Sequence, residues 1–278
     1  MLPLQLYLDE SGHASRHPIV AVAGFLGTAE AWSDFPARWN GILSSHGVVP
    51  PFHMTDFEAK KAQFRGWDET RRRALLAPLM DEITARPLCM IGTALAVDRF
   101  NALDWDIYPE YQRIENPYHW AMQDVLRHAV KASDDPDLPE CHGERIATVI
   151  AAQQEFQGAA DGYYRATAFS ERKLVARAMF SDQAEFPQLQ AADIAAFELR
   201  WKITRPDLDR FPWCEIVKTG RTVLSVRGID PSVFLPRDGG PVYDMTVSKQ
   251  RRPVDVMLKM KDTKARRNQG KRSRKPPS

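Results

Sequence analysis

The hydrophobic and polar positions near the N-terminus follow first a strand period and then a helix period. Residues 4–9 alternate with a period of two and lead into a Ser-Gly turn, which predicts a strand that carries Asp9 at its C-terminal edge. Residues 19–26 are apolar on both faces, so we expect a second, buried strand that forms a hairpin with the first. Apolar side chains at helical spacing over 32–43 then predict a helix.

The rest of the chain continues to mix helical and strand patterns, and no internal repeat is visible. This mixture predicts an α/β fold with a sheet flanked by helices. We expect one domain over residues 1–250. The further expected helices cover 68–85, 117–131, 159–169 and 187–202, and the further expected strands cover 88–97, 146–151, 174–180, 215–217 and 222–226.

Composition narrows the class of protein. The chain has 278 residues, of which 44% are hydrophobic and 27% charged, which excludes a collagen, a coiled coil or a fully disordered chain. No segment reaches the roughly 18 consecutive apolar residues of a membrane span, and the first residues lack the basic segment of a signal peptide. The three cysteines, Cys89, Cys141 and Cys214, are too few for a disulfide framework. We therefore expect a cytoplasmic protein with no membrane contact.

Charge is distributed unevenly along the chain. Residues 251–278 hold 11 Lys or Arg against two Asp, whereas residues 1–250 hold 27 basic and 34 acidic residues. Because the C-terminal segment has few apolar groups, we expect a disordered basic tail. One interpretation is an arm that binds nucleic acid by neutralising phosphates, and the other is a solubilising tail that contacts the acidic body. The basic side chains expected to contact nucleic acid are Lys264, Arg266, Arg267, Lys271, Arg272, Arg274 and Lys275.

Several acidic residues fall where a sheet places ligands. Asp9 ends the first strand, Asp182 follows the expected strand at 174–180, and Asp193 lies on an alanine-rich helix. Facing carboxylates bind Mg2+ or Mn2+ through oxygen, an arrangement suited to phosphodiester hydrolysis. Each acid also has a structural interpretation: Asp182 as a turn residue and Asp193 as a solvated or hydrogen-bonded helix residue. Glu10 is expected on the opposite side of the strand from Asp9.

A second group of candidates lies between the first two expected helices. His53 and Asp56 would share one face of a helix, where they are candidates for a general base or a substrate contact. The alternative is that Asp56 caps a helix from Phe57 and that His53 is half buried. An aromatic loop over 105–118 is a further candidate for stacking on bases, although it is interspersed with acids. The phosphate-loop, dinucleotide, zincin and serine-hydrolase motifs are absent from the sequence.

Three motifs, in this order, resemble a bacterial and phage family called domain of unknown function 3800. They are Y-L-D-E-S-G at 7–12, H-M-T-D at 53–56, and F-S-D-Q-A-E-F-P-Q-L-Q-A-A-D-I-A-A at 180–196. The resemblance covers about residues 4–202 and implies a ribonuclease H-like fold, in which acids on a central sheet and a late helix hold Mg2+ or Mn2+.

The resemblance also assigns roles to individual positions. It implies that Asp9 is the first-strand acid with Glu10 as its motif partner, that Asp182 is the acid after the late strand, and that Asp193 is the late-helix acid. Relatives of this kind commonly carry an acid where this chain has Ala152. Either Glu155 or an inward-turned Glu10 would then replace the lost ligand.

The leading functional hypothesis is a metal-dependent nuclease or phosphodiesterase, in a phage-defence or mobile-element setting as the resemblance implies. Asp9 and Asp193 would hold the ion, Asp182 or Glu10 would complete its ligands, and His53 or Asp56 would transfer a proton or contact the substrate. DNA, RNA and a nucleotide conjugate stay open as substrates. The alternative hypothesis is a catalytically inactive module of the same fold that binds nucleic acid or protein.

Overall fold

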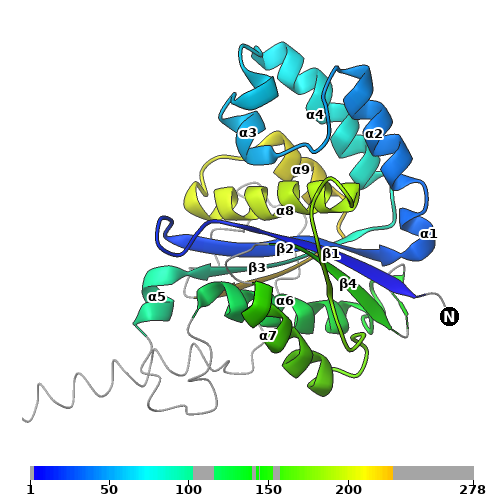
Figure 1. The fold of residues 1–278 in the computed structure, drawn as a ribbon, viewed down its shortest axis with the longest axis vertical. Helices are drawn as coiled ribbons and strands as arrows, with labels where there is room; N and C mark the ends of the chain where they lie inside the picture. Colours follow the sequence, from blue (N-terminus) through cyan, green and yellow to red (C-terminus); the bar gives the residue numbers. More distant parts are fainter. Residues whose placement is uncertain (1–2, 103–115, 140–141, 144, 153–156, 228–278) are drawn as a thin grey trace, which may run out of the picture.

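The computed structural model describes residues 3–102, 116–139, 142–143, 145–152 and 157–227 (Figure 1). The expected basic tail and most of the expected aromatic loop lie outside these residues, as do Glu155 and Cys141. The described part is an α/β structure built on one mixed sheet.

The sheet has six strands in the order β5-β4-β1-β2-β3-β6. β1, β2 and β3 form an antiparallel meander, while β4 pairs parallel with β1, β5 with β4 and β6 with β3. The central position of β1 buries nearly all of its residues between neighbouring strands and the layers on both sides. The strands are β1 Leu4–Ser11, β2 Ile19–Thr28, β3 Cys89–Ala96, β4 Ile146–Ala151, β5 Met179–Ser181 and β6 Thr222–Arg227.

Helices cover both faces of the sheet (Figure 1). α8 lies across β1 and β2 on one face, and α6 packs against β2 and β3 on the other, with α7 beside it. The α-helices are α1 Ala29–Trp32, α2 Phe35–Ser45, α3 Met54–Glu58, α4 Glu69–Thr84, α5 Val97–Asn101, α6 Pro117–Ala132, α7 Gln157–Ser170, α8 Pro187–Thr204 and α9 Phe211–Lys218. A 3-10 turn, η1, covers Ala62–Phe64.

The pleat of β1 divides the core into two clusters. Tyr7 belongs to the cluster on the α8 side of the sheet, whereas Leu6 and Leu8 belong to the cluster on the α6 side. Because successive strand residues point to opposite faces, Asp9 follows Tyr7 towards α8 and Glu10 follows Leu8 towards α6. The end of β1 therefore presents one carboxylate to each layer.

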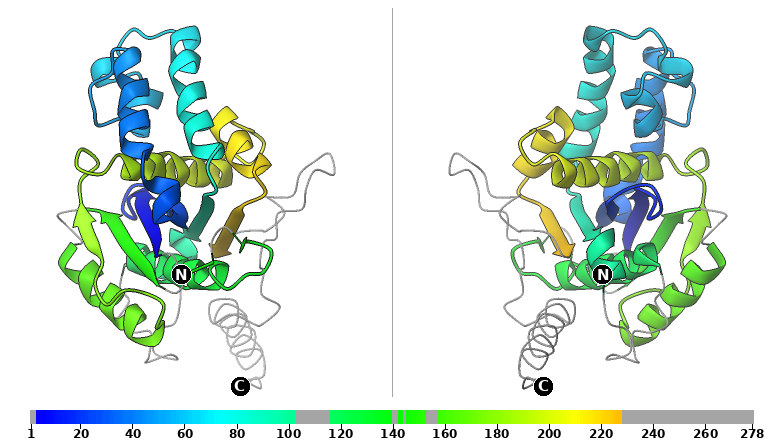
Figure 2. Two further views of the ribbon diagram at one scale, coloured as in Figure 1. Left: turned by 90° about the vertical axis from the view of Figure 1, so that its right-hand side faces the viewer. Right: turned by 90° about the vertical axis from the view of Figure 1, so that its left-hand side faces the viewer.

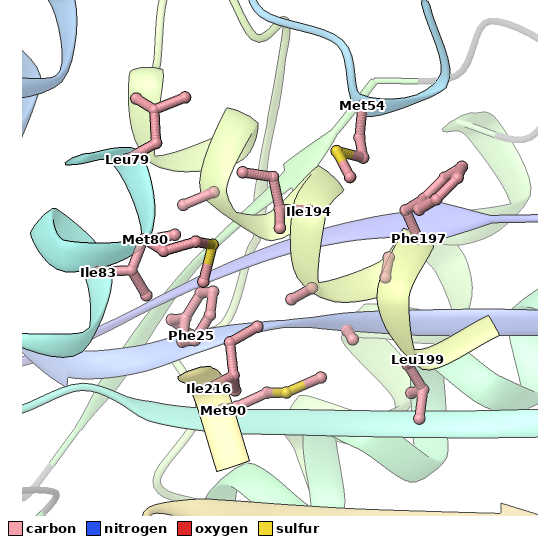
Figure 3. Close-up of a cluster of buried hydrophobic side chains, with 14 of the residues drawn as sticks. Phe25, Met54, Leu79, Met80, Ile83, Met90, Ile194, Phe197, Leu199 and Ile216 are labelled. Carbon is pink, nitrogen blue, oxygen red and sulfur yellow. The ribbon is translucent and has the colours of Figure 1, made fainter. Parts of the chain in front are cut away.

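A further helical layer lies on the side of α8 away from the sheet. Figure 2 shows two of its helices, α2 and α4, standing side by side. α4 packs against α2 and α9, and α2 and α3 both contact α8. Figure 3 shows Met54 of α3 above Ile194 and Phe197 of α8, in the cluster that continues down to Phe25 and Met90 of the sheet. Burial of these apolar surfaces fixes α3 over the middle of α8.

Most of the expected elements are confirmed to within a few residues, and two expectations are wrong. Residues 215–217 lie in a helix, α9, instead of a strand. The strand expected at 174–180 is only Met179–Ser181, because bends at 176–177 interrupt it after Leu174 bridges to Ile146. In the part of the chain that the structure describes, no helix combines the length and apolar character needed to cross a bilayer.

Candidate functional site

Asp9 is buried near the C-terminal end of β1, with 5% of its surface exposed. Its Oδ1 accepts a hydrogen bond from the backbone amide of Glu10 at 2.8 Å, and its Oδ2 accepts one from Nε2 of Gln183 at 2.6 Å. Gln183 follows β5, two strands away in the sheet, so the β5–α8 connection reaches across to the end of β1. These two donors orient the carboxyl group of Asp9.

Asp193 lies on the same side of the sheet, in the second turn of α8, and is 8% exposed. Its Oδ2 accepts a hydrogen bond of 2.7 Å from the backbone amide of Met54, the first residue of α3. Three residues earlier on the same helix, Gln190 is fully buried. Its Oε1 accepts from Nε1 of Trp39 at 2.8 Å and from the amide of Phe52 at 2.9 Å. α8 thus anchors the segment before α3 through two side chains on one face.

The carboxyl groups of Asp9, Glu10 and Asp193, which we call the acid cluster, act on each other electrostatically. Burial raises the pKa of Asp9 well above its usual range, and the charges of Glu10 and Asp193 raise it further. Burial and the charge of Asp193 raise the pKa of Glu10 to about 8. Burial raises the pKa of Asp193 to about 7, against the Met54 hydrogen bond and with a contribution from Asp56. The two aspartates, 184 residues apart in the chain, therefore lie close enough for their charges to interact.

No arginine, lysine or histidine among the described residues forms an ion pair with the acid cluster. Elsewhere the protein does pair its buried acids: Glu198 accepts from Arg210 at 3.0 Å, and so does Glu58. Burying an unpaired charge is costly, and the raised pKa values are the consequence. Among the described residues, the acid cluster therefore has no cationic side chain that would neutralise its charge.

Two buried oxygen atoms at the cluster also lack a partner. Neither Oε2 of Glu10 nor Oε1 of Gln183 has a hydrogen-bond partner within the described structure. Buried polar atoms are nearly always satisfied by protein, water or a ligand. Both atoms are oxygen acceptors beside Asp9, and such atoms suit a hard divalent cation.

The structure places the other expected site residues differently. Asp182 is exposed, and its Oδ1 accepts the amides of Ala184 and Glu185 at 2.9 Å each, as in the turn interpretation. Asp56 lies inside α3 rather than capping it, close enough to raise the pKa of Asp193. His53 occupies the position before α3 and is exposed, so the expectation that it is half buried is wrong.

The position after β4 contributes no acid. Ala152 is exposed, and its amide donates to the carbonyl of Ser181 at 2.8 Å. Since Ile150 pairs with Leu8, Ala152 lies at the same edge of the sheet as the acid cluster. Within the residues that the structure describes, no group of three or more His, Cys, Asp or Glu side chains is arranged to hold a metal ion. The acid cluster thus offers fewer converging ligands than the resemblance implies.

A cavity of about 190 Å³ adjoins the cluster on the α6 side of the sheet. Glu10, His13, Val20, Asn116 and Tyr118 line it, together with Gly12 and Ala14. The charges of Glu10 and Asp9 act with burial to raise the pKa of the Tyr118 phenol. The carboxyl group of Glu10 therefore connects the acid cluster to a partly apolar hollow.

Sequence reasoning missed three polar residues at this site. Gln183 lies inside the motif at 180–196, but the motif does not indicate that its Nε2 donates a hydrogen bond to Asp9. Gln190 was likewise passed over, because a buried glutamine has no pattern that separates it from an exposed one. Arg200 on α8 donates from Nε to Oγ of Ser11 at 2.8 Å, and no motif indicated this contact.

Comparison of the chain with models of protein families and with curated proteins gave no match.

Proposed function

We propose that this protein is a metal-dependent phosphodiesterase or nuclease that acts on DNA or RNA, with a ribonuclease H-like fold of the domain of unknown function 3800 type. The observation that carries the proposal is the placement of Asp9 and Asp193 on the same side of the sheet, as two buried carboxyl groups whose charges interact and for which no ion pair with a described cationic side chain is found. The antiparallel β1–β3 meander, continued by parallel β4 and β5, supports the ribonuclease H-like classification.

The donor atoms fit a hard divalent ion. Asp9 and Asp193 supply carboxylate oxygens, and the unpartnered Oε2 of Glu10 and Oε1 of Gln183 supply further oxygens beside them. Such an all-oxygen set favours Mg2+ or Mn2+ over zinc. The bound ion would polarise a phosphoryl oxygen and lower the pKa of a bound water.

The chain's own groups then have separate tasks. Gln183 and the Glu10 amide hold the carboxyl group of Asp9, and the Met54 amide holds that of Asp193. In the metal-free protein the pKa of Glu10 is about 8, so its carboxyl group would exchange a proton near neutral pH where it is not bound to the ion, and it is our candidate general acid or base. His53, exposed just before α3, and Asp56 within α3 would contact the substrate.

The test compares Asp9→Asn and Asp193→Asn with the parent in Mn2+ or Mg2+ cleavage assays on DNA and RNA. Each substitution should reduce activity by more than roughly 100-fold, the upper effect of losing an outer partner of a metal ligand. Manganese binding by calorimetry should weaken in parallel. Asp81→Asn, at an exposed position on α4, is the matched control and should match the parent. Equal cleavage by all four proteins would refute the proposal.

A second candidate function is a catalytically inactive module that binds nucleic acid. The observations that favour it are Ala152 at the sheet edge and the outward-turned Asp182, which leave the cluster short of converging acids. This candidate predicts nucleic-acid binding that neither EDTA nor Asp193→Asn alters. Metal-dependent cleavage would exclude it.

A further inference from the structure

Arg200 lies beside the acid cluster on the same pair of elements. Asp193 and Arg200 are seven residues apart on α8, two turns that return to one face. Asp9 and Ser11 are two residues apart on β1 and also share a face. The Arg200–Ser11 hydrogen bond of 2.8 Å thus joins α8 to β1 at a second level, next to the level of Asp9 and Asp193. The spacing between the two levels is about 7 Å from Asp9 to Ser11 along β1 and about 10 Å from Asp193 to Arg200 along α8.

The backbone makes room for this arginine. Gly12 follows Ser11 with a φ of +93°, a conformation that glycine adopts without strain. A Cβ atom at this position would lie 2.8 Å from Cδ of Arg200 and 2.4 Å from the carbonyl oxygen of Ile19. A glycine is therefore required where the β1–β2 turn, residues 12–18, passes over the Arg200 side chain.

Arg200 differs from three other partly buried arginines. Arg72, Arg86 and Arg210 each pair with a glutamate, but Arg200 pairs with no acid among the described residues. Its Nε is used by Ser11, while its two terminal nitrogens have no partner in the same part of the chain. Burial lowers the pKa of Arg200, so its charge is incompletely solvated. A guanidinium presented in this way is suited to bidentate binding of an anion.

Other basic groups gather around it. The positive charges of Arg200, His13 and Arg16 all act with burial to lower the pKa of His17. His17 is held in the turn because its Nδ1 accepts the backbone amide of His13 at 2.9 Å. We call Arg200, Arg16 and His17 the basic cluster. An anion bound among them would relieve their mutual repulsion.

We propose that the basic cluster binds a phosphate of a nucleic-acid strand, next to the phosphodiester that meets the acid cluster. This inference rests on the proposed function for the identity of the strand, but not for the anion site itself. Arg200 would supply a guanidinium fork to the phosphate, with His17 and Arg16 at its sides. The acid cluster and the basic cluster follow one another along β1 and α8, and their order would set the direction in which the nucleic-acid strand crosses the site.

The test measures binding without cleavage. The full chain is titrated in EDTA with a fluorescein-labelled single-stranded oligonucleotide, by anisotropy, over a range of NaCl concentrations. Arg200→Gln should weaken binding roughly tenfold and reduce the salt slope by about one. The affinity of Arg200→Lys should lie between those of the parent and Arg200→Gln, because a lysine keeps the positive charge but loses the two-pronged geometry of the guanidinium. Arg165→Gln, an exposed arginine paired with Asp161 on α7, should bind like the parent.

The outcomes separate this inference from the proposed function. A folded Arg200→Gln protein that binds like the parent would overturn the phosphate site, whether or not the parent cleaves nucleic acid. Weakened binding in the absence of any metal-dependent cleavage would leave the phosphate site standing and refute the nuclease. Polyglutamate that competes as well as an unlabelled oligonucleotide would overturn the assignment to nucleic acid.

A second measurement uses the parent protein and so does not depend on the variant folding. The pKa of His17 is followed by NMR with and without the oligonucleotide, and with inorganic phosphate alone. Burial, and after it the charge of Arg200, lowers the pKa of His17, and a bound phosphate should raise this pKa because a nearby negative charge favours the protonated imidazole. An unchanged His17 pKa at saturating oligonucleotide would overturn the site. A rise with the oligonucleotide supports it, and an equal rise with phosphate alone shows that one phosphate group suffices.

Discussion

The carboxyl groups of the acid cluster make stability depend on pH. Because the folded pKa values of Glu10 and Asp193, about 8 and about 7, lie above the unfolded ones, the folded protein binds more protons between about pH 4 and 8. The free energy of unfolding of the metal-free protein should therefore fall as pH rises through this window, by a few kcal/mol in all.

Urea unfolding in EDTA at a series of pH values checks this expectation. Asp193→Asn should flatten the dependence, because it removes one of the carboxyl groups that take up protons on folding. Mn2+ should restore stability at pH 8, where the ionised cluster binds a cation best. A metal-free stability that rises from pH 5 to pH 8 would contradict the raised pKa values.

Gln190 is a second residue whose environment predicts a measurable effect. It accepts hydrogen bonds from Trp39 and Phe52, and its Nε2 donates to the Gln183 carbonyl at 2.7 Å. Gln190→Leu leaves these buried partners unsatisfied and should destabilise the protein by roughly 3 kcal/mol. Gln188→Leu is the matched control on the same helix, because the Oε1 of Gln188 has no partner within the described structure, and should cost less than about 1 kcal/mol. Equal unfolding midpoints in urea for the two variants would contradict the role of Gln190.

At the scale of elements, an ion network ties the additional helical layer to α8. Arg210, just before α9, donates from Nε to both carboxylate oxygens of Glu198 and from Nη2 to Glu58 of α3, each at 3.0 Å. Although burial lowers the pKa of Arg210, the charges of Glu198 and Glu58 raise it above its ordinary value. Arg72 of α4 joins the same network through Glu58. The network therefore connects four helices.

Removal of Arg210 should leave Glu198, which is fully buried, without its partner. Arg210→Met is expected to destabilise the protein by roughly 3–5 kcal/mol. Lys218→Met removes an exposed, solvent-screened pair with Glu215 and should leave the free energy of unfolding nearly unchanged. Thermal and urea unfolding measure both values. The double variant Arg210→Met/Glu198→Gln should recover part of the loss, and a double variant no better than the single one would contradict the explanation.

The elements also show where sequence patterns suffice. β1, β2 and β4 followed from alternation or apolar runs, and α8 from its apolar and small residues, because these patterns are local. α9 was mistaken for a strand because a short apolar run has no clear period. Its Trp213, Ile216 and Val217 have the spacing of one helix face, and this spacing becomes visible only when residues before 215 are included.

At the scale of the whole molecule, the site could be predicted only in part. The end of β1 was a recognisable ligand position, but the meeting of Asp9 with Asp193 depends on how α8 packs across β1 and β2. That arrangement follows from the burial of the apolar surfaces, which no spacing in the sequence reports. The contact between Arg200 and Ser11 arises from the same packing and was equally hidden.

The charge difference between the body and residues 251–278 leads to a prediction for the full chain. Deletion of residues 259–278 should weaken binding to polynucleotides and flatten its salt dependence, because fewer counterions are released. Cleavage of a short substrate in saturating metal should change much less, since the acid cluster is built from the folded part. Binding and salt slope equal to those of the full chain would assign the tail to solubility.

The bond between Asp193 and Met54 has an evolutionary consequence. Its donor is a main-chain group, which every amino acid except proline supplies. The side chain at position 54 is therefore free to drift among apolar residues that fill the same space, while the late-helix carboxylate keeps its anchor. A comparison of related sequences would show variation at position 54 and would therefore not reveal that the backbone amide of this residue holds the carboxyl group of Asp193.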